Sequence, residues 1–198
     1  MAPLPSLALS LVLCTGFGSS TQREPPKSPS PHDAMAGHQH EGHSMPSAPG
    51  QSPYAGSQGN EIKALSPEEI QAYQEGTGHG MAKPAELNHY PGPRHVLDLA
   101  AELQLTEKQT AEVRAIYDRM HIRAVSLGEQ IIERERSLDR AFATGTLDQA
   151  KLQTAVGRIG ELQSALRATH LQAHLETKAV LQPDQIRRYD VLRGYISQ

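Results

Sequence analysis

The chain has few of the residues from which a thick globular core is built. It contains no Trp and two Phe, and aromatic residues make up only 4% of its 198 residues. Aromatic rings dominate the energetics of most cores, so Leu, Ile, Val and Ala must supply the packing here. Aliphatic side chains of this kind suit contacts between helices. The composition therefore favours helix-on-helix packing.

Charge of one sign, cysteine and catalytic signatures are also scarce. The formal net charge is −3, whereas a dedicated nucleic-acid binder carries a basic surplus. The single cysteine, Cys14, excludes a disulfide within the chain. The G-x-x-x-x-G-K-[ST] phosphate loop, the G-x-S-x-G elbow and the HExxH motif are all absent from the sequence. We therefore predict a protein that is not an enzyme, requires no cofactor and binds no nucleic acid.

Residues 1–20 have the composition of an export signal. The apolar run 7–13 is too short to span a bilayer, which takes about 20 residues. Small residues follow it, among them Gly18 and Ser20, as before a signal-peptide cleavage site. The stretch LVLC also resembles a lipoprotein box, although Leu13 stands where a small residue is usual. We expect export to the periplasm, as a soluble protein or one anchored by a lipid on Cys14.

The next segment, residues 21–60, is rich in Pro, Ser, Gly, His and Gln and has hardly an aliphatic side chain. Such a stretch cannot bury enough apolar surface to offset the entropy that ordering it would remove. We predict a disordered tether over residues 21–60 and a helical domain over residues 61–198.

Helix-start signals divide this domain. Three pairs have the spacing of a capping box, in which two residues three apart bond each other's backbone amides: Ser66 with Glu69, Thr106 with Gln109, and Thr146 with Gln149. Pro183 suits the first turn of a last helix. A short helix is expected over residues 93–103, and residues 76–93 are expected to be mostly loop.

Two long segments repeat apolar residues at helical spacing. The first contains Val113, Ile116, Met120, Ala124, Leu127, Ile131, Leu138 and Phe142. The second contains Leu152, Ala155, Ile159, Leu162, Leu166, Thr169, Ala173 and Val180. Only Thr144-Gly145 interrupts the pattern, and so short a connection forces antiparallel helices. The predicted fold is all-α, a long antiparallel helical hairpin with short flanking helices.

Three glycines, Gly128, Gly157 and Gly160, lie inside the predicted long helices. Each weakens a helix by about 1 kcal/mol relative to Ala. They permit either close approach of another segment or bending of the helix, and the sequence leaves both readings open.

The motif LTxxQ flanks this hairpin twice. The first copy is complete in Leu105, Thr106 and Gln109; in the second, Leu181 and Gln185 fit while Gln182 stands where Thr is expected. With these motifs and the stretch HYPGPRHVLDLAAELQLT, residues 62–195 resemble the Spy/CpxP family of periplasmic proteins, which has heavy-metal resistance and sensor relatives such as ZraP and CnrX.

This resemblance implies a curved helical homodimer that binds unfolded or misfolded envelope proteins under stress without ATP. A chaperone of this kind, a holdase, is our first functional hypothesis. The metal-sensing relatives bind zinc, nickel or cobalt through His and carboxylate side chains. They imply the alternative, a metal-binding envelope protein for heavy-metal sensing or resistance, and a sensor would need a partner in the membrane. A structural coiled-coil spacer would show neither behaviour.

The tether contains a first candidate metal site. Four histidines fall within twelve residues: His32, His38, His40 and His43. Imidazole is a good ligand for Zn, Cu and Ni, so we predict a labile site for Zn²⁺ or copper here. The alternative is a polar tether in which the histidines are incidental.

The hairpin contains a second candidate metal site. His170 and His174 are four residues apart and share a helix face. If the hairpin turns near residue 145, His121 lies opposite residue 169, so the three imidazoles approach one another. The alternative is that these positions, at the flank of the helix seam, are solvated.

The remaining motifs have a structural and a functional reading. We interpret the LTxxQ residues as structural, because Thr106 and Gln109 satisfy free amides at a helix start and Leu105 anchors the turn. Arginines recur along the long helices among Glu and Asp. Arginine contacts both apolar and acidic client surface, but mixed charge is equally typical of a solvated helix face.

Overall fold

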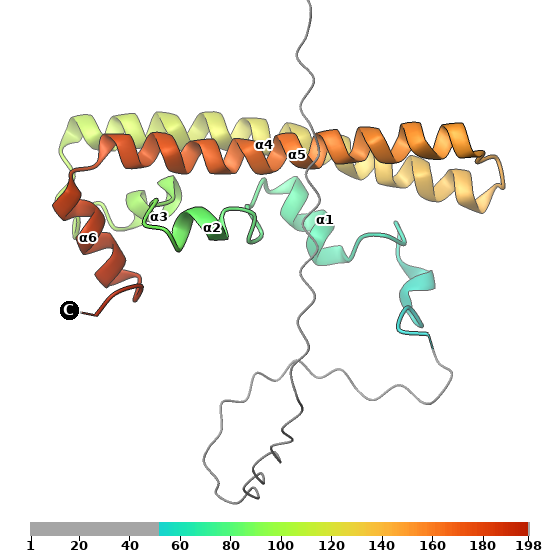
Figure 1. Cartoon of the computed structure of the whole chain (residues 1–198), viewed down its shortest axis with the longest axis horizontal. Coiled ribbons are helices and arrows are strands. Elements are labelled where there is room, and N and C mark those ends of the chain that lie inside the picture. Colours follow the sequence, from blue (N-terminus) through green and yellow to red (C-terminus); the bar gives the residue numbers. More distant parts are fainter. Residues whose placement is uncertain (1–51, 198) are drawn as a thin grey trace, which may run out of the picture. The chain divides into compact units, whose positions relative to one another are not determined.

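The structure, a computed structural model, describes residues 52–197 (Figure 1). In this part of the chain there is one short 3-10 helix, η1 (Ser57–Gly59), six α-helices and no strand. The prediction of an all-α fold is therefore confirmed for these residues. The predicted export signal, the lipid anchor on Cys14, most of the tether and its four candidate metal-binding histidines lie outside the described residues.

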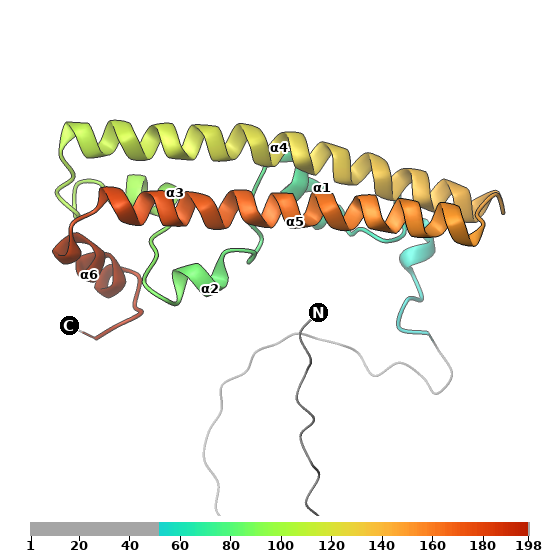
Figure 2. The same ribbon diagram turned by 45° about the horizontal axis from the view of Figure 1, so that its top comes forward.

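Helices α4 (Glu107–Ala143) and α5 (Gln149–Val180) form the predicted hairpin. They contain 37 and 32 residues and lie side by side along their whole length (Figures 1 and 2). At 1.5 Å per residue each is about 50 Å long. The chain reverses at Gly145, whose φ of 64° is accessible to glycine at little cost.

The start of α5 differs from the prediction that Thr146 and Gln149 form a capping box. Asp148 is the N-cap, and its Oδ1 accepts a 2.8 Å hydrogen bond from the Lys151 amide. Thr146 instead shares a hydroxyl–hydroxyl hydrogen bond of 3.0 Å with Thr144. The helix begins two residues later than predicted because a carboxylate at its start satisfies a free amide and also faces the positive end of the helix dipole.

The seam of the hairpin is buried over only part of its length. Its central cluster contains Ala124, Leu127, Ile131, Leu162 and Leu166. The last buried residue of α4 is Ile132 and the first of α5 is Ile159. Residues 133–158, which we call the hairpin tip, therefore contain no buried residue. Predicted seam residues in the tip, such as Leu138 and Ala155, are half-buried, and Phe142 is 61% exposed.

The short helices α1 (Pro67–Gln74), α2 (Lys83–Glu86), α3 (Pro93–Asp98) and α6 (Pro183–Leu192) lie on one side of the hairpin (Figures 1 and 2). Toward the tip, Ile62 and Leu65 pack on Ile132. At the other end a base cluster joins α3, α4 and α6 through Val96, Leu103, Val113, Leu181 and Tyr189. This layer covers one face of the hairpin; the opposite side of α4 we call the free face.

Two of the short helices differ from the expected pattern. Helix α2 occupies part of the segment expected to be mostly loop. Helix α3 ends at Asp98, earlier than the predicted 103. The chain continues in turns to Gln104, whose φ is 52°, and these turns carry Leu103 into the base cluster with 2% exposure. The helix therefore ends early, and the turns that follow it allow Leu103 to be buried.

The glycines of the long helices have different roles. A Cβ at Gly128 would lie 2.2 Å from the carbonyl oxygen of Tyr73, so α1 touches the backbone of α4 at this point. A Cβ at Gly157 or Gly160 would meet nothing within 4 Å. Gly128 is therefore the position of close approach. None of the described helices is long and apolar enough to cross a membrane.

Candidate functional site

The two LTxxQ copies meet at the base of the hairpin. Thr106 and Gln109 form the predicted capping box, with the Gln109 amide 3.1 Å from Thr106 Oγ1 and the Thr106 amide 3.1 Å from Gln109 Oε1. In the second copy, Gln185 Oε1 accepts a 2.9 Å hydrogen bond from the Gln182 amide. Each motif glutamine thus caps the start of its own helix.

The same two glutamines also bond to each other and across the base. Gln109 Nε2 donates to Gln185 Oε1 at 2.8 Å, and Gln185 Nε2 donates to Gln109 Oε1 at 3.2 Å. Gln109 Nε2 also lies 3.0 Å from the Val180 carbonyl, and Gln185 Nε2 lies 3.2 Å from the Leu103 carbonyl. We call this arrangement the glutamine clasp. It ties the start of α4 to the start of α6 and supports the structural interpretation of the motif.

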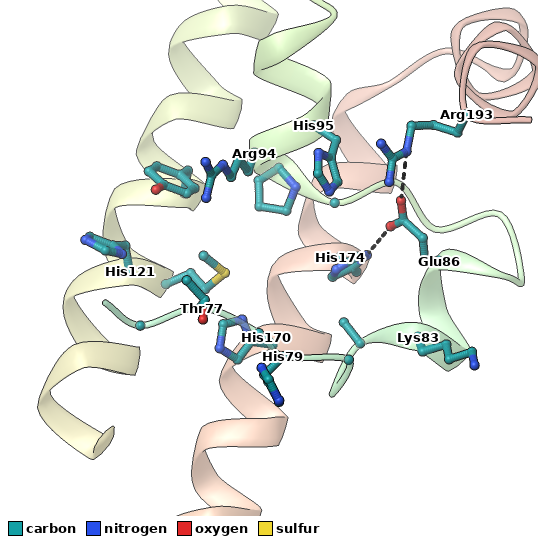
Figure 3. A pocket seen from close by; sticks show the side chains of 18 of the residues that line it. Thr77, His79, Lys83, Glu86, Arg94, His95, His121, His170, His174 and Arg193 are labelled. Atoms are coloured by element: carbon teal, nitrogen blue, oxygen red, sulfur yellow. Dashed lines mark ion pairs between the residues drawn. The ribbon is translucent and has the colours of Figure 1, made fainter. Parts of the chain in front are cut away.

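A second feature, the histidine pocket, is a cavity of about 510 Å³ between the hairpin and the short helices. Its lining includes His79 from the α1–α2 loop, Glu86 from α2, His95 from α3, and His170 and His174 from α5 (Figure 3). His121 of α4 also belongs to the lining, so tertiary packing gathers imidazoles from four separate segments.

The ring of His170 is buried in the pocket. The residue is 4% exposed, and its Nε2 has no hydrogen-bond partner among the described residues. The loop passes directly over the ring, since a Cβ at Gly78 would lie 3.4 Å from His170 Nδ1. Burial, and next the neighbouring His174, lower the pKa of His170 below 6.5. The ring is therefore held as neutral imidazole, the form that can bind a metal ion.

His174 has a defined tautomer. Its Nδ1 lies 2.7 Å from the carbonyl oxygen of Tyr90. A carbonyl only accepts, so Nδ1 carries the proton and Nε2 of the neutral ring presents its lone pair. Metal-binding histidines are typically oriented in this way by a backbone carbonyl. The chain also passes close on the other side, because a Cβ at Gly92 would lie 2.9 Å from His174 Cε1.

Glu86 links the pocket to α6. Its Oε2 lies 3.5 Å from His174 Nδ1, and its Oε1 accepts hydrogen bonds from the Tyr189 hydroxyl and, at 3.0 Å, from the Tyr195 hydroxyl. Arg193 Nε lies 3.7 Å from the same oxygen (Figure 3). Burial and then the hydrogen bond to Glu86 raise the pKa of Tyr189. One carboxylate therefore contacts both His174 and the C-terminal helix.

The predicted hairpin metal site comes together only in part. His170 and His174 share the pocket, while His121 lies across it on α4 and stacks on Tyr117 with ring centroids 5.6 Å apart (Figure 3). Within residues 52–197 no three His, Cys, Asp or Glu side chains are grouped so as to hold one metal ion. The expectation that these positions are solvated is wrong for His170 and His174, which the short-helix layer buries.

Sequence reasoning missed His79, Glu86 and His95. The run Gly76–Gly80 reads as linker, yet it places a histidine between two glycines over the pocket, with a φ of 38° at His79. For His79, the position of a histidine between two glycines was the sequence signal that could have indicated a site. Glu86 and His95 had none, since only the packing of α2 and α3 on α5 brings them to the pocket.

A third feature, the tip groove, is a cavity of about 790 Å³ between α4 and α5 at the hairpin tip. Helix α4 supplies Arg134, Ser137, Leu138 and Ala141; the turn and α5 supply Thr146, Leu147, Ala150, Lys151, Thr154, Ala155 and Arg158. Three of these eleven residues are cationic and none is acidic. The aliphatic side chains between them are half-buried or exposed.

The tip groove lies on the free face. Ile132 faces the short-helix layer through Ile62. At 3.6 residues per turn, Ala141 lies two and a half turns from Ile132, and Arg134 just over half a turn. Both therefore face the opposite side. A smaller groove of about 250 Å³, lined by Arg119 and Arg123 among others, shares that side.

A helical hairpin closed at its base and half-buried at its tip, with no strand in the described residues, defines the structural class. The chain belongs to the heavy-metal resistance family, whose sequence profile matches residues 69–188. This family is Spy/CpxP-like, which confirms the resemblance seen in the LTxxQ motifs. It is a family of non-enzymatic resistance and chaperone-like proteins. No curated protein and no solved structure is significantly similar to the chain.

Proposed function

We propose that the protein is an ATP-independent holdase that binds unfolded or misfolded proteins of the bacterial envelope. The observation that carries this proposal is the tip groove, where aliphatic side chains remain accessible beside Arg134, Lys151 and Arg158. Unfolded chains expose apolar segments, and a groove with an apolar floor removes such segments from water. Export to the periplasm and assembly as a homodimer remain predictions from the sequence and belong to this proposal.

The experiment is suppression of aggregation of a denatured client, followed by light scattering without ATP and with a chelator present. We expect the full chain to suppress scattering. Replacing Leu138 and Leu147 by Asn should weaken the suppression several-fold, because both leucines line the tip groove.

The matched control is Leu192→Asn, which removes a 44% exposed leucine on α6, outside the tip groove. We expect it to act like the unaltered chain. Equal suppression by the groove variant and the control would show that the tip groove is not where clients bind. No suppression by the unaltered chain would reject the holdase function itself.

A second candidate function is metal binding for heavy-metal sensing or resistance. The buried Nε2 of His170, which has no partner among residues 52–197, and the oriented ring of His174 favour it, as does membership of the family. Imidazole is chemically suited to Zn²⁺ or copper, and His170 and His174 supply two such rings in one pocket. The tether histidines would supply a separate, labile site: His32, His38, His40 and His43.

Competition for Zn²⁺ against a chromophoric chelator separates these sites. One variant replaces the four tether histidines by Gln, and a second also replaces His170 and His174 by Gln. The control in the same background is His121→Gln. If the pocket binds zinc, the affinity for Zn²⁺ persists in the first variant and falls at least tenfold in the second. The control should bind Zn²⁺ like the first variant. If replacing the tether histidines alone abolishes Zn²⁺ binding, the pocket does not bind zinc.

A further inference from the structure

Cationic side chains and carboxylates are unequally distributed between the covered face of α4 and the lining of the tip groove. On the covered face of α4, arginine and lysine are paired across the layer: Arg136 with Glu61 at 2.8 Å, and Lys63 with Asp139 at 3.2 Å. The lining of the tip groove contains three cations and no carboxylate. The cations of the covered face are therefore paired with carboxylates across the layer, whereas those of the tip groove have no carboxylate partner within the groove lining.

The three groove cations are accessible. Arg134, Lys151 and Arg158 are all exposed, and Arg134 forms no ion pair with any described residue. Lys151 lies 3.2 Å from Asp148, and Arg158 lies 2.9 Å from Glu161, acids that are outside the groove lining. Exposed ion pairs of this kind contribute little and exchange readily. Each cation can therefore turn to a carboxylate presented from within the groove.

The groove cations come from both helices. Arg134 comes from α4, whereas Lys151 and Arg158 come from α5, and the same lining includes Leu138, Ala141 and Ala155. The long apolar stems of Arg and Lys can pack on apolar surface while their charged ends stay in water. A segment lying in the groove would therefore meet both apolar surface and positive charge.

We propose that the tip groove selects extended client segments in which carboxylates accompany apolar side chains, and disfavours equally apolar segments that carry lysine or arginine. This inference rests on the proposed holdase function and specifies its clients. Charge complementarity decides the occupant: the groove lining contains three exposed cations and no carboxylate, so an acidic segment adds attractive pairs whereas a basic segment adds repulsion. The interaction is exposed to solvent, so it weakens as salt rises.

The experiment measures binding of short fluorescein-labelled peptides to the full chain by fluorescence anisotropy. The peptides share one pattern of Leu and Ser and carry Asp, Asn or Lys at the remaining positions. We expect affinity to fall from the Asp to the Asn to the Lys peptide, and the difference to shrink at high salt. Equal affinities at low salt would overturn the inference.

Two triple variants separate groove charge from net charge. The groove variant is Arg134→Gln, Lys151→Gln and Arg158→Gln; the control is Arg114→Gln, Arg187→Gln and Arg188→Gln, which removes the same charge from exposed positions outside the groove. For the Asp peptide we expect a loss of about tenfold in the groove variant, roughly twofold for each exposed pair. The Asn peptide should bind both variants like the unaltered chain. Equal losses in the two variants would overturn the inference.

Further outcomes separate this inference from the function on which it rests. If the chain suppresses client aggregation but shows no charge preference, the inference fails and the holdase function stands. If no peptide binds and aggregation is not suppressed, the holdase function fails. If sedimentation shows that a second copy closes the tip groove and peptides do not compete with it, the groove is an interface between copies and the inference is overturned.

Discussion

Gln109 and Gln185 join two helix starts that lie far apart in the sequence, with Gln109 Nε2 2.8 Å from Gln185 Oε1. Each glutamine also caps its own helix and donates to a carbonyl of the other segment. The LTxxQ motif is thus more than a helix cap. Its glutamine is the point at which the flanking helices are fastened to each other.

Replacing Gln185 by Ala should lower the free energy of unfolding by roughly 1–3 kcal/mol, because the side chain is 9% exposed and its loss leaves buried polar partners unpaired. Urea unfolding followed by circular dichroism measures this change. The matched control is Gln153→Ala, an exposed glutamine of α5, expected to change stability by less than about 0.5 kcal/mol.

The double variant Gln109→Ala with Gln185→Ala should be less destabilised than the sum of the two single variants. The second substitution removes a partner that the first has already left unpaired, so the two effects couple by about 0.5–3 kcal/mol. Strict additivity in a double-mutant cycle would mean that the two glutamines act only as separate caps.

Gly128→Ala and Gly160→Ala should change stability in opposite directions. A methyl group at Gly128 would lie 2.2 Å from the Tyr73 carbonyl oxygen and push α1 off α4. We expect it to destabilise the protein by roughly 1–3 kcal/mol. A methyl group at Gly160 meets nothing and should stabilise α5 by about 1 kcal/mol. Thermal unfolding compares the two, and a shift of the same sign in both would contradict the close contact between α1 and α4.

The free energy of unfolding should decrease as the pH is lowered below about 6.5. Burial lowers the pKa values of His170 and His95, so the unfolded chain takes up these protons before the folded chain does. The contribution to stability is therefore complete above the unfolded pKa of 6.5 and is lost as pH falls through the lowered folded values. Urea unfolding at a series of pH values measures the slope. His170→Gln should flatten the slope, and an unchanged slope in this variant would contradict the prediction.

Asp148→Ala should lower the melting temperature, while Asp148→Asn should retain most of the stability, because an amide oxygen can still accept from the Lys151 amide. The Lys151 backbone amide is also the main cause of the lowered pKa of Asp148. Thr146→Ala is the comparison at the position first expected to cap the helix. A larger loss from Thr146→Ala than from Asp148→Ala would contradict the observed start of α5.

The helices and their order follow from local features of the sequence. The capping boxes at Ser66 and Thr106 form as predicted. Helical periodicity predicts both long helices, and Pro183 is the first residue of α6. These features act over a few residues, through free amides, fixed proline geometry and apolar spacing, so the sequence alone suffices to place them. The same local logic misplaces the start of α5, where Thr146 and Asp148 are both able to cap a helix and only the folded turn selects Asp148.

The contacts that define the sites depend on tertiary packing. Both LTxxQ copies are visible in the sequence, but only the fold brings Gln109 to Gln185. The spacing of His170 and His174 is visible too, yet their burial follows from the layer laid over α5. The tip groove exists because that layer packs on the opposite side of α4 and leaves the hairpin tip without a buried core. Sequence alone determined α1, the two long helices and α6, whereas α2 and the end of α3 were not predicted. Burial, pairing and exposed surface were decided by how the helices pack, since each depends on residues distant in the chain.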